Sequence, residues 1–376
     1  MPVVDCIIGG SPCQNLSAAG LRTGLDGEES SLFYHQIRLV KEMRKHSARK
    51  GDNAISPRFM VWENVKGAYY CNNGEDFRKV LEEVARIKQQ DIVIPRFTGQ
   101  PSERESGCIV GDGFSIAWRL LDSQYHGVPQ HRERICLVAD FDGYSAPDVV
   151  FEVCEQFSSP EQLGKSVLGR HFRGDWLGKI HADKKAMRFI VAGDREGFTD
   201  RAESAPDLHR IIEKYKTCAE RVKYVNDTDI SSTITVKRRY ASTFCNALYG
   251  GRCLQPTKEG YIVREFTPCE LERLQGFPDD WTNIGEYTDT KGKVRKTTYD
   301  KILFSIGNSI TPKVFERPIR QISKQFDHTP TMGSLFDGIG GFPLIWEKIN
   351  GRGTCLWASE INEFGIAVTR KHFPEE

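Results

Sequence analysis

The sequence predicts an α/β fold in which helices cover a doubly wound parallel sheet. Short apolar runs bounded by glycines, helix-like segments between them, and a late Gly-rich turn all favour this class. The chain has 376 residues, 39% of them hydrophobic, and a net charge of +1. This length is enough for two domains and a sizeable core. No apolar run approaches the roughly 20 residues that cross a bilayer.

The expected strands are apolar runs that stop at glycines or polar residues. In chain order they are residues 3–8, 58–62, 134–139, the start of 333–341, and 356–360. The expected helices repeat apolar residues at helical spacing, as Ile37 and Val40 do in the first. They are residues 32–43, 74–88, 115–123 and 362–372. Since strands alternate with helices, ligands should bind at the carboxyl ends of the strands.

Cysteine spacing and local charge limit the kinds of site that the sequence can form. None of the eleven cysteines is spaced C-x-x-C, so we expect reduced thiols, with Cys6 and Cys136 in the core, and no metal site. Residues 165–239 hold 17 Lys and Arg against 11 Asp and Glu, with aromatic residues interleaved. This stretch is predicted to be a separate module. Its charge fits a nucleic-acid face and an ordinary solvated surface equally well.

A nucleoside pocket is indicated late in the sequence. Residues 333–341 have the pattern of a strand, a Gly-rich turn and a helix start, and Glu360 ends the next strand. Glycines let the backbone approach a ligand, and an acid after the next strand binds ribose hydroxyls.

Three strand ends place a thiol, a carboxylate and two guanidiniums on one rim. They are Cys13 after the first strand, Glu63 after the second, and residues 130–134 before the third. Positive neighbours favour the thiolate form of a cysteine, which makes it a usable nucleophile. A carboxylate on the same rim can protonate or hydrogen-bond a ring nitrogen.

The sequence resembles the cytosine-C5 DNA methyltransferases in six segments. They are Gly-Gly-Ser-Pro-Cys-Gln (9–14), Glu-Asn-Val (63–65), Gln-His-Arg-Glu-Arg (130–134), Arg-Leu-Gln-Gly-Phe-Pro-Asp-Asp-Trp (273–281), Gly-Asn-Ser (307–309) and Phe-Asp-Gly-Ile-Gly-Gly (336–341). The resemblance implies a Rossmann-like S-adenosylmethionine-dependent methyltransferase sheet with a smaller target-recognition domain. The implied division is a first catalytic part at 1–142, the recognition domain at 143–297 and a second catalytic part at 298–376.

The order of these segments is rotated. In most of the family the Gly turn opens the chain, whereas here the nucleophile strand comes first and the Gly turn last. The resemblance therefore implies a circular permutation, joined near residues 323–332. The family's next strand, which contacts the adenine, has no counterpart after Glu360. We expect other residues to close that wall, a second chain to supply the strand, or the cofactor to bind weakly.

The resemblance implies methyl transfer from S-adenosyl-L-methionine to C5 of a cytosine flipped out of duplex DNA, leaving S-adenosyl-L-homocysteine. Cys13 is implied to add to C6 while Glu63 engages N3 and the exocyclic amine. Arg132 and Arg134 are implied to stabilise charge and orient the base, and Asn64 to support the loop. A buried inert Cys13 and a structural salt bridge at Arg134 are the alternatives.

Cofactor and DNA contacts follow from the same resemblance. Phe336 should contact the adenine and Glu360 the ribose hydroxyls. The other expected cofactor contacts are Asp337, Gly338, Ile339, Gly340, Gly341, Ile361, Pro12, Leu32, Asn308 and Ser309. The expected DNA contacts are Gln14 and Ser17 near the nucleophile and the phosphate-binding Lys237, Arg238 and Arg239.

The predicted protein is thus a cytoplasmic enzyme of a bacterium or phage, in a restriction–modification system or as an orphan methyltransferase. One alternative keeps the chemistry but acts on tRNA, and the long basic module argues against it. The other is one chain of a two-part enzyme or a non-catalytic DNA-binding relic, which the absent strand suggests.

Overall fold

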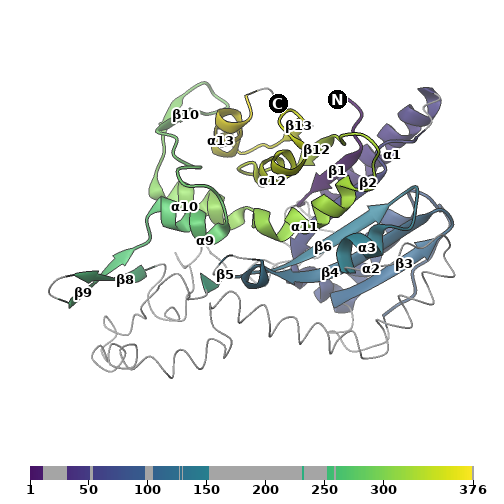
Figure 1. Cartoon of the computed structure of the whole chain (residues 1–376), viewed down its shortest axis with the longest axis horizontal. Coiled ribbons are helices and arrows are strands. Elements are labelled where there is room, and N and C mark those ends of the chain that lie inside the picture. Colours follow the sequence, from purple (N-terminus) through teal and green to yellow (C-terminus); the bar gives the residue numbers. More distant parts are fainter. Residues whose placement is uncertain are drawn as a thin grey trace.

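The computed structural model describes residues 1–11, 32–50, 54–97, 105–126, 128, 130–151, 231–232, 252–257 and 260–374. Its centre is a seven-stranded sheet in the order β13-β12-β1-β2-β6-β4-β3 (Figure 1). The strands are β1 (Cys6–Gly9), β2 (Phe59–Val65), β3 (Ser106–Gly111), β4 (Phe114–Asp122), β6 (Glu133–Asp140), β12 (Met332–Leu335) and β13 (Cys355–Ser359). The predicted α/β class is confirmed.

The sheet has two halves that differ in strand direction. β13, β12, β1 and β2 are parallel, whereas β6, β4 and β3 each run antiparallel to the strand before them in the sheet. The expectation of a parallel sheet is therefore right for one half only. Because β6 runs backwards, it begins beside the end of β2, with Arg134 opposite Val65. The reversal brings the start of β6 to the carboxyl ends of the parallel strands.

The predicted helix at residues 115–123 is wrong, because this segment is strand β4. β4 lies between β3 and β6, and its side chains are buried on both faces of the sheet, Ile116 and Trp118 on one and Ala117 on the other. A strand covered on both faces is apolar almost throughout and lacks the alternation of a half-exposed strand. The two-residue turn Asp112-Gly113, with Gly113 at φ +69°, is the hairpin signal that points to the strand.

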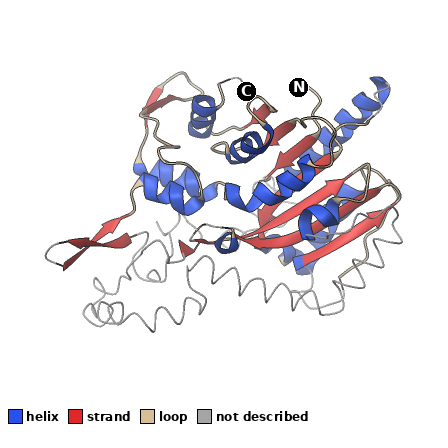
Figure 2. Cartoon of the chain, viewed as in Figure 1, coloured by secondary structure: helices blue, strands red, loops and turns tan. Residues whose placement is uncertain are grey.

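Helices cover both faces of the sheet (Figure 2). They are α1 (Leu32–Lys50), α2 (Glu75–Ala85), α3 (Ala146–Phe151), α9 (Pro268–Gln275), α10 (Tyr299–Asn308), α11 (Pro312–Ser323), α12 (Gly341–Asn350) and α13 (Glu363–His372), with short 3-10 turns η2 (Lys66–Tyr69), η3 (Cys71–Gly74) and η5 (Ser123–Tyr125). The other three predicted helices are confirmed, and the first extends to Lys50. The core positions of Cys6 and Cys136 are confirmed too, since both are fully buried. Among the described helices, none is long and apolar enough to cross a membrane.

A third apolar cluster joins α9, α10 and α13. Phe277 and Trp281, which follow α9, pack there with Ile339 of the Gly-rich turn and with Phe364 of α13. The segment after α9 therefore shares a core with the second catalytic part, although it falls inside the predicted recognition domain. The recognition domain boundaries stay a prediction. Three short pairs complete the described elements: β5 (Gln130–His131) with β7 (Ser231–Ser232), β8 (Arg252–Thr257) with β9 (Gly260–Glu265), and β10 (Glu286–Thr288) with β11 (Val294–Lys296).

β1 lies between strands from opposite parts of the chain. One neighbour is β2, and the other is β12, more than 300 residues later. The Asp5 carboxylate accepts hydrogen bonds from both the N–H and the hydroxyl of Thr331 at 2.8 Å. Side chain and backbone together therefore close this seam of the sheet.

Candidate functional site

The first part of the site begins where β1 ends. Trp62 Nε1 donates to Ser11 Oγ at 3.0 Å, and Asn64 Nδ2 donates to the Ser11 carbonyl at 3.2 Å. Asn64 thus contacts the last described residue before the loop that it is expected to support, and that support stays a prediction. The residues predicted to follow Ser11 at the site, and the three basic DNA contacts, lie outside the described residues. Their roles stay predictions: Pro12, Cys13, Gln14, Ser17, Lys237, Arg238 and Arg239.

Glu63 is buried at this rim and forms an ion pair with Arg134. Its side chain lies with Oε1 3.1 Å from Arg134 Nε. Oε2 is only 2.8 Å from the position that a Cβ on Gly10 would occupy, so the carboxylate abuts the chain leaving β1. Burial raises the pKa of the Glu63 carboxyl, and the charges of Arg134 and Arg132 limit that rise. The carboxyl therefore keeps a proton to higher pH than an ordinary glutamate does.

Arg132 makes different contacts from Arg134. It is 2% exposed, and its guanidinium donates to the carbonyls of Gly307 and Ser309 at 3.0 and 2.6 Å. Its backbone N–H donates to Asp122 Oδ1 at 3.1 Å. Arg132 thus holds the Gly-Asn-Ser segment against the rim, while Arg134 contacts Glu63 directly. The predicted part of Arg132 in orienting the base stays a prediction.

A chain of buried amides ties the rim to two further segments. Gln130 Nε2 donates to Gln275 Oε1 at 2.9 Å, and Gln275 Nε2 donates to the Ser309 carbonyl at 2.9 Å. Both glutamine side chains are fully buried. Gln275 had no predicted role, and its place inside the Arg273–Trp281 segment is the signal that could have pointed to it.

The Gly-rich turn after β12 forms the second part of the site. Phe336, Gly338 and Gly340 have φ of +57°, +63° and +81°, a region that glycine adopts at little cost. No atom of the described residues lies within 4 Å of the position that a Cβ on Gly338 would occupy, so this backbone has open space beside it. α12 begins directly after the turn, at Gly341. A ligand can therefore approach the turn at the backbone of Gly338.

Two carboxyl groups hold the turn, one from within it and one from the end of the next strand. Asp337 is buried and accepts a hydrogen bond from Ser334 Oγ at 2.5 Å, and burial raises its pKa to about 7. Glu360 lies on the other side, where Oε2 accepts the Gly338 N–H at 2.6 Å. Its Oε1 accepts the N–H groups of Ile361 and Asn362, each at 2.7 Å. Asp337 therefore shapes the turn from inside, while Glu360 stands at the turn where the sequence places it.

The other predicted cofactor residues differ in exposure. Leu32 is half-buried at the start of α1, Asn308 is exposed at the end of α10, and Ser309 is buried. Ile361 is 89% exposed. β13 has β12 on one side and no other described strand on its outer side. The open space at Gly338, the Glu360 carboxylate and an exposed apolar side chain fit S-adenosylmethionine, with its polar ribose and flat adenine.

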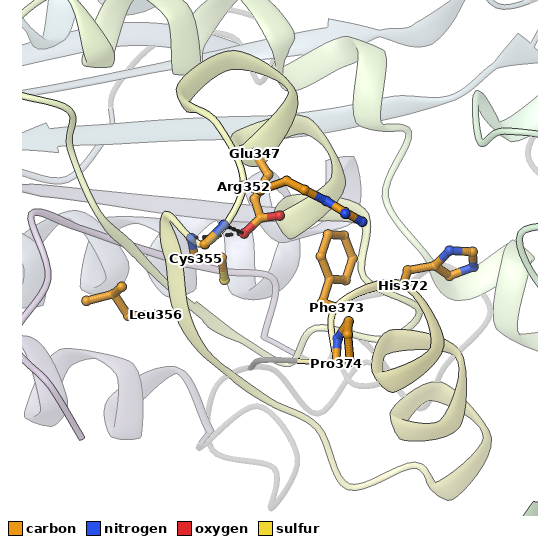
Figure 3. A pocket seen from close by; sticks show the side chains of 8 residues that line it. Glu347, Arg352, Cys355, Leu356, His372, Phe373 and Pro374 are labelled. Carbon is orange, nitrogen blue, oxygen red and sulfur yellow. Dashed lines mark hydrogen bonds between the residues drawn. The ribbon is translucent and has the colours of Figure 1, made fainter.

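A cavity of about 270 Å³ lies elsewhere, between the ends of α12 and α13 (Figure 3). It is lined by Glu347, Arg352, Gly353, Cys355, Leu356, His372, Phe373 and Pro374. Glu347 Oε1 accepts the Gly353 N–H at 2.8 Å, which ties the loop before β13 to α12. Cys355 begins β13, whereas Glu360 follows its far end. The cavity is therefore at the opposite end of this strand from the predicted cofactor residues.

Each of the six resembling segments is joined to another by a polar contact. Asn64 bonds Ser11, Glu63 pairs with Arg134, and Arg132 bonds Gly307 and Ser309. Gln130 bonds Gln275, and Trp281 Nε1 donates to the Ile339 carbonyl at 2.7 Å. Segments spread over more than 300 residues thus form one continuous site.

Comparison with known proteins matches this arrangement to one family. A family model described as C-5 cytosine-specific DNA methylase matches residues 1–88 and 110–324. A DNA N-6-adenine-methyltransferase of Escherichia phage P1 is 27% identical over 341 residues, covering 74% of this chain and 45% of the relative. The type II methyltransferase M.XorII of Xanthomonas oryzae is 22% identical over 374 residues, covering 91% and 73%. The chain thus spans less than half the length of the phage relative.

Comparison with solved structures finds similarity at low sequence identity. The Dnmt2 methyltransferase of S. pombe is 16% identical, with a TM-score of 0.40 over 86% of this chain and 79% of that one.

Proposed function

Because the chain belongs to the family of C-5 cytosine-specific DNA methylases, we propose that it methylates C5 of cytosine in double-stranded DNA. The observation that carries this proposal is the buried Glu63–Arg134 pair beside Ser11, where the resembling segments meet. A buried carboxyl with a raised pKa suits contact with a ring nitrogen of a base held at this rim. The excess of basic residues at 165–239 is compatible with a polyanionic substrate.

The chemistry we propose depends on a covalent bond from Cys13. S-adenosylmethionine, when bound, supplies the methyl group. The Cys13 thiolate bonds to C6 of a flipped-out cytosine, the ring electrons move to C5, and Glu63 donates a proton or hydrogen bond to N3. C5 thereby becomes the nucleophile. Once C5 carries the methyl group, its proton passes to a water molecule, and the electrons of that C–H bond restore the C5–C6 double bond as the thiolate leaves C6. Any proton on N3 returns to Glu63.

The two arginines support this chemistry in different ways. Arg134 orients the Glu63 carboxyl through the contact of its Nε with Oε1 at 3.1 Å, which leaves Oε2 to hold the proton, and Arg132 positions residues 307–309 through two carbonyls. At the turn, the proposed holders of the cofactor are Glu360 for the ribose and Phe336 and Ile361 for the adenine. The product there is S-adenosylhomocysteine.

We also propose that the family's motif order is circularly permuted in this chain. Two findings support it: the family model stops at residue 324, before the Gly-rich turn, and the strand leading into that turn pairs directly with β1. The outer side of β13 and the exposed Ile361 leave the adenine wall open within the described strands. Calorimetric titration of the purified chain measures its affinity for S-adenosylhomocysteine and so tests whether the adenine site is complete. Weak binding would favour a second chain that supplies a strand.

The setting we propose is DNA modification in the cytoplasm of a bacterium or a phage-infected cell, either beside a cognate nuclease or alone. The decisive experiment is transfer of labelled methyl from S-adenosylmethionine to mixed-sequence duplex DNA. Cys13→Ala should abolish transfer and retain DNA binding. Cys108→Ala, which removes a half-buried thiol from β3, is the matched control and should retain transfer.

The identity of the labelled base and polymer separates the alternatives. Label recovered as 5-methylcytosine in DNA from the wild type and Cys108→Ala supports the proposal. Label in N6-methyladenine would contradict it and agree with the name of the phage P1 relative. Label in tRNA rather than duplex DNA would transfer the same chemistry to another substrate. Residual transfer by Cys13→Ala would remove the thiol from the mechanism.

A further inference from the structure

Trp281 fixes one peptide of the Gly-rich turn from behind. Its Nε1 donates to the Ile339 carbonyl at 2.7 Å, and its side chain is 5% exposed. The N–H of the same peptide, that of Gly340, donates to the Asp337 carbonyl at 3.2 Å. Both polar groups of this peptide are therefore satisfied. The peptide cannot rotate without breaking a buried hydrogen bond, which is costly when the freed group stays out of water.

The indole is itself held in place by aromatic contacts. The His372 ring stacks on it with centroids 3.7 Å apart and planes 1° apart, and the Phe277 ring lies 5.6 Å away. His372 Nε2 donates to the Trp281 carbonyl at 2.8 Å. Burial lowers the pKa of His372, which favours the neutral ring that stacks here. The indole therefore has one defined orientation.

The loop that carries Trp281 is anchored on both sides. The buried Glu272 carboxylate accepts the N–H and the hydroxyl of Thr282 at 2.6 and 2.5 Å. Lys371 of α13 donates to the carbonyls of Asp280 and Asn283 at 3.3 and 3.1 Å. These bonds fix the loop between α9 and α13, so the Trp281 N–H is presented to the turn by a rigid frame.

We propose that Trp281 is a positioning residue for the cofactor site. It holds the Ile339–Gly340 peptide so that the turn keeps the positive φ values of Gly338 and Gly340, and so that Gly338 stays against Glu360. Because the indole lies on the buried side of the turn, it acts through the backbone rather than by touching the cofactor. This inference rests on the proposed function, since it takes the turn to be where S-adenosylmethionine binds.

The test compares two matched substitutions in the full chain. Trp281→Phe removes the N–H and keeps an aromatic ring. Trp346→Phe makes the same change in α12, at a fully buried tryptophan whose Nε1 has no hydrogen-bond partner among the described residues. Affinity for S-adenosylhomocysteine is measured by calorimetry, and hydrogen exchange of the amides at 337–341 is measured in the cofactor-free protein.

We expect Trp281→Phe to weaken cofactor affinity about tenfold and to speed exchange in the turn, because one buried hydrogen bond is lost. The KM for S-adenosylmethionine should rise, while kcat at saturating cofactor stays near the wild-type value. Trp346→Phe should leave the affinity and the exchange unchanged. This split distinguishes positioning of the cofactor site from a general loss of structure, which would affect kcat as well.

Two results would overturn the inference: unchanged affinity in Trp281→Phe, or equal exchange rates in the two variants. If the wild type binds no cofactor, the proposed function fails, and the exchange comparison still decides whether Trp281 holds the turn. If Trp281→Phe does not fold, His372→Ala replaces it, since that variant keeps the indole N–H and removes the ring stacked on it. Smaller losses of affinity and smaller increases in exchange are expected for His372→Ala. If neither quantity changes, the inference is contradicted.

Discussion

The rim around Glu63 and the turn around Gly338 are built in different ways. At the rim, buried charges do the positioning: Glu63 pairs with Arg134, and Arg132 binds two carbonyls. At the turn, backbone groups at positive φ set the shape, and Glu360 binds the backbone of Gly338. Replacing a charged side chain at the rim by a neutral one of the same volume should therefore impair catalysis. Ligand binding at the turn should depend most on changes to its backbone.

The largest effect should come from Glu63→Gln, which preserves shape and removes the titrating group. We expect methyl transfer to fall by about 10²- to 10⁴-fold, the usual contribution of a general acid. Cofactor affinity should not change, because the described contacts of Glu63 are with Arg134 and the chain at Gly10 rather than with the turn. Glu105→Gln is the control, since Glu105 also pairs with a cation, Lys66. Single-turnover rates measure both variants, and equal rates would show that the Glu63 carboxyl is not used.

The turn can be tested by adding one methyl group. Gly338 and Gly292 both have positive φ, +63° and +76°, and a Cβ at either would have no neighbour within 4 Å in the part of the chain that the structure describes. Changing either to Ala should cost about 1 kcal/mol of unfolding free energy through backbone strain. Only Gly338→Ala should also weaken binding of S-adenosylhomocysteine, because its methyl group enters the space at the turn. Equal affinities in the two variants would remove Gly338 from the binding surface.

Asp337 is a charge-bearing residue inside the backbone-built turn, and it makes stability depend on pH. Burial raises its pKa to about 7, so the folded state binds more protons than the unfolded state between the ordinary aspartate range and pH 7. Its contribution to stability is full at low pH and is lost as the pH rises to about 7. Asp337→Asn removes that loss, so the variant should gain on the wild type up to pH 7 and then keep a constant difference. Urea unfolding at several pH values measures this, and parallel curves would contradict it.

The smallest effect should come from an exposed charge pair. His328 is half exposed and contacts Asp327 at 3.0 Å and Asp5 at 3.4 Å. The hydrogen bond to Asp327 raises the pKa of His328, so its contribution is present below the unfolded pKa and lost as the pH rises through the folded one. His328→Gln should cost at most about 1 kcal/mol at pH 5.5 and less at pH 8. A larger loss of stability would show that this exposed pair contributes as much as a buried pair such as Glu63–Arg134.

Local sequence predicted the parts of the fold whose signals are local. β1, α1 and the turn at 336–341 each carry their own pattern of apolar residues and glycines. The direction of β6 and the strand state of β4 depend on pairing with distant segments, which a single stretch of sequence does not encode. For the same reason the sequence of residues 115–123 predicts a helix where the structure has β4.

For the candidate site, the sequence predicted the strand ends at which Glu63 and Glu360 lie, and it did not predict the contacts that distinguish similar residues. Arg132 and Arg134 lie two positions apart in one segment, and only the packed structure shows that Arg134 contacts Glu63 while Arg132 holds Gly307 and Ser309. Gln275 and Trp281 act through partners in other segments, Ser309 and Ile339. Their roles follow from long-range packing, and the spacing of residues in the sequence does not predict them.

The pairing of β1 with β12 has a consequence for how the chain folds during synthesis. One of the two strands that flank residues 6–9 is residues 332–335, which leave the ribosome more than 300 residues later. Until that segment is made, one edge of β1 has unpaired backbone groups beside an apolar surface. Contacts of such large sequence separation form slowly and expose intermediates to aggregation. Expression at low temperature or with chaperones should therefore raise the yield of folded protein.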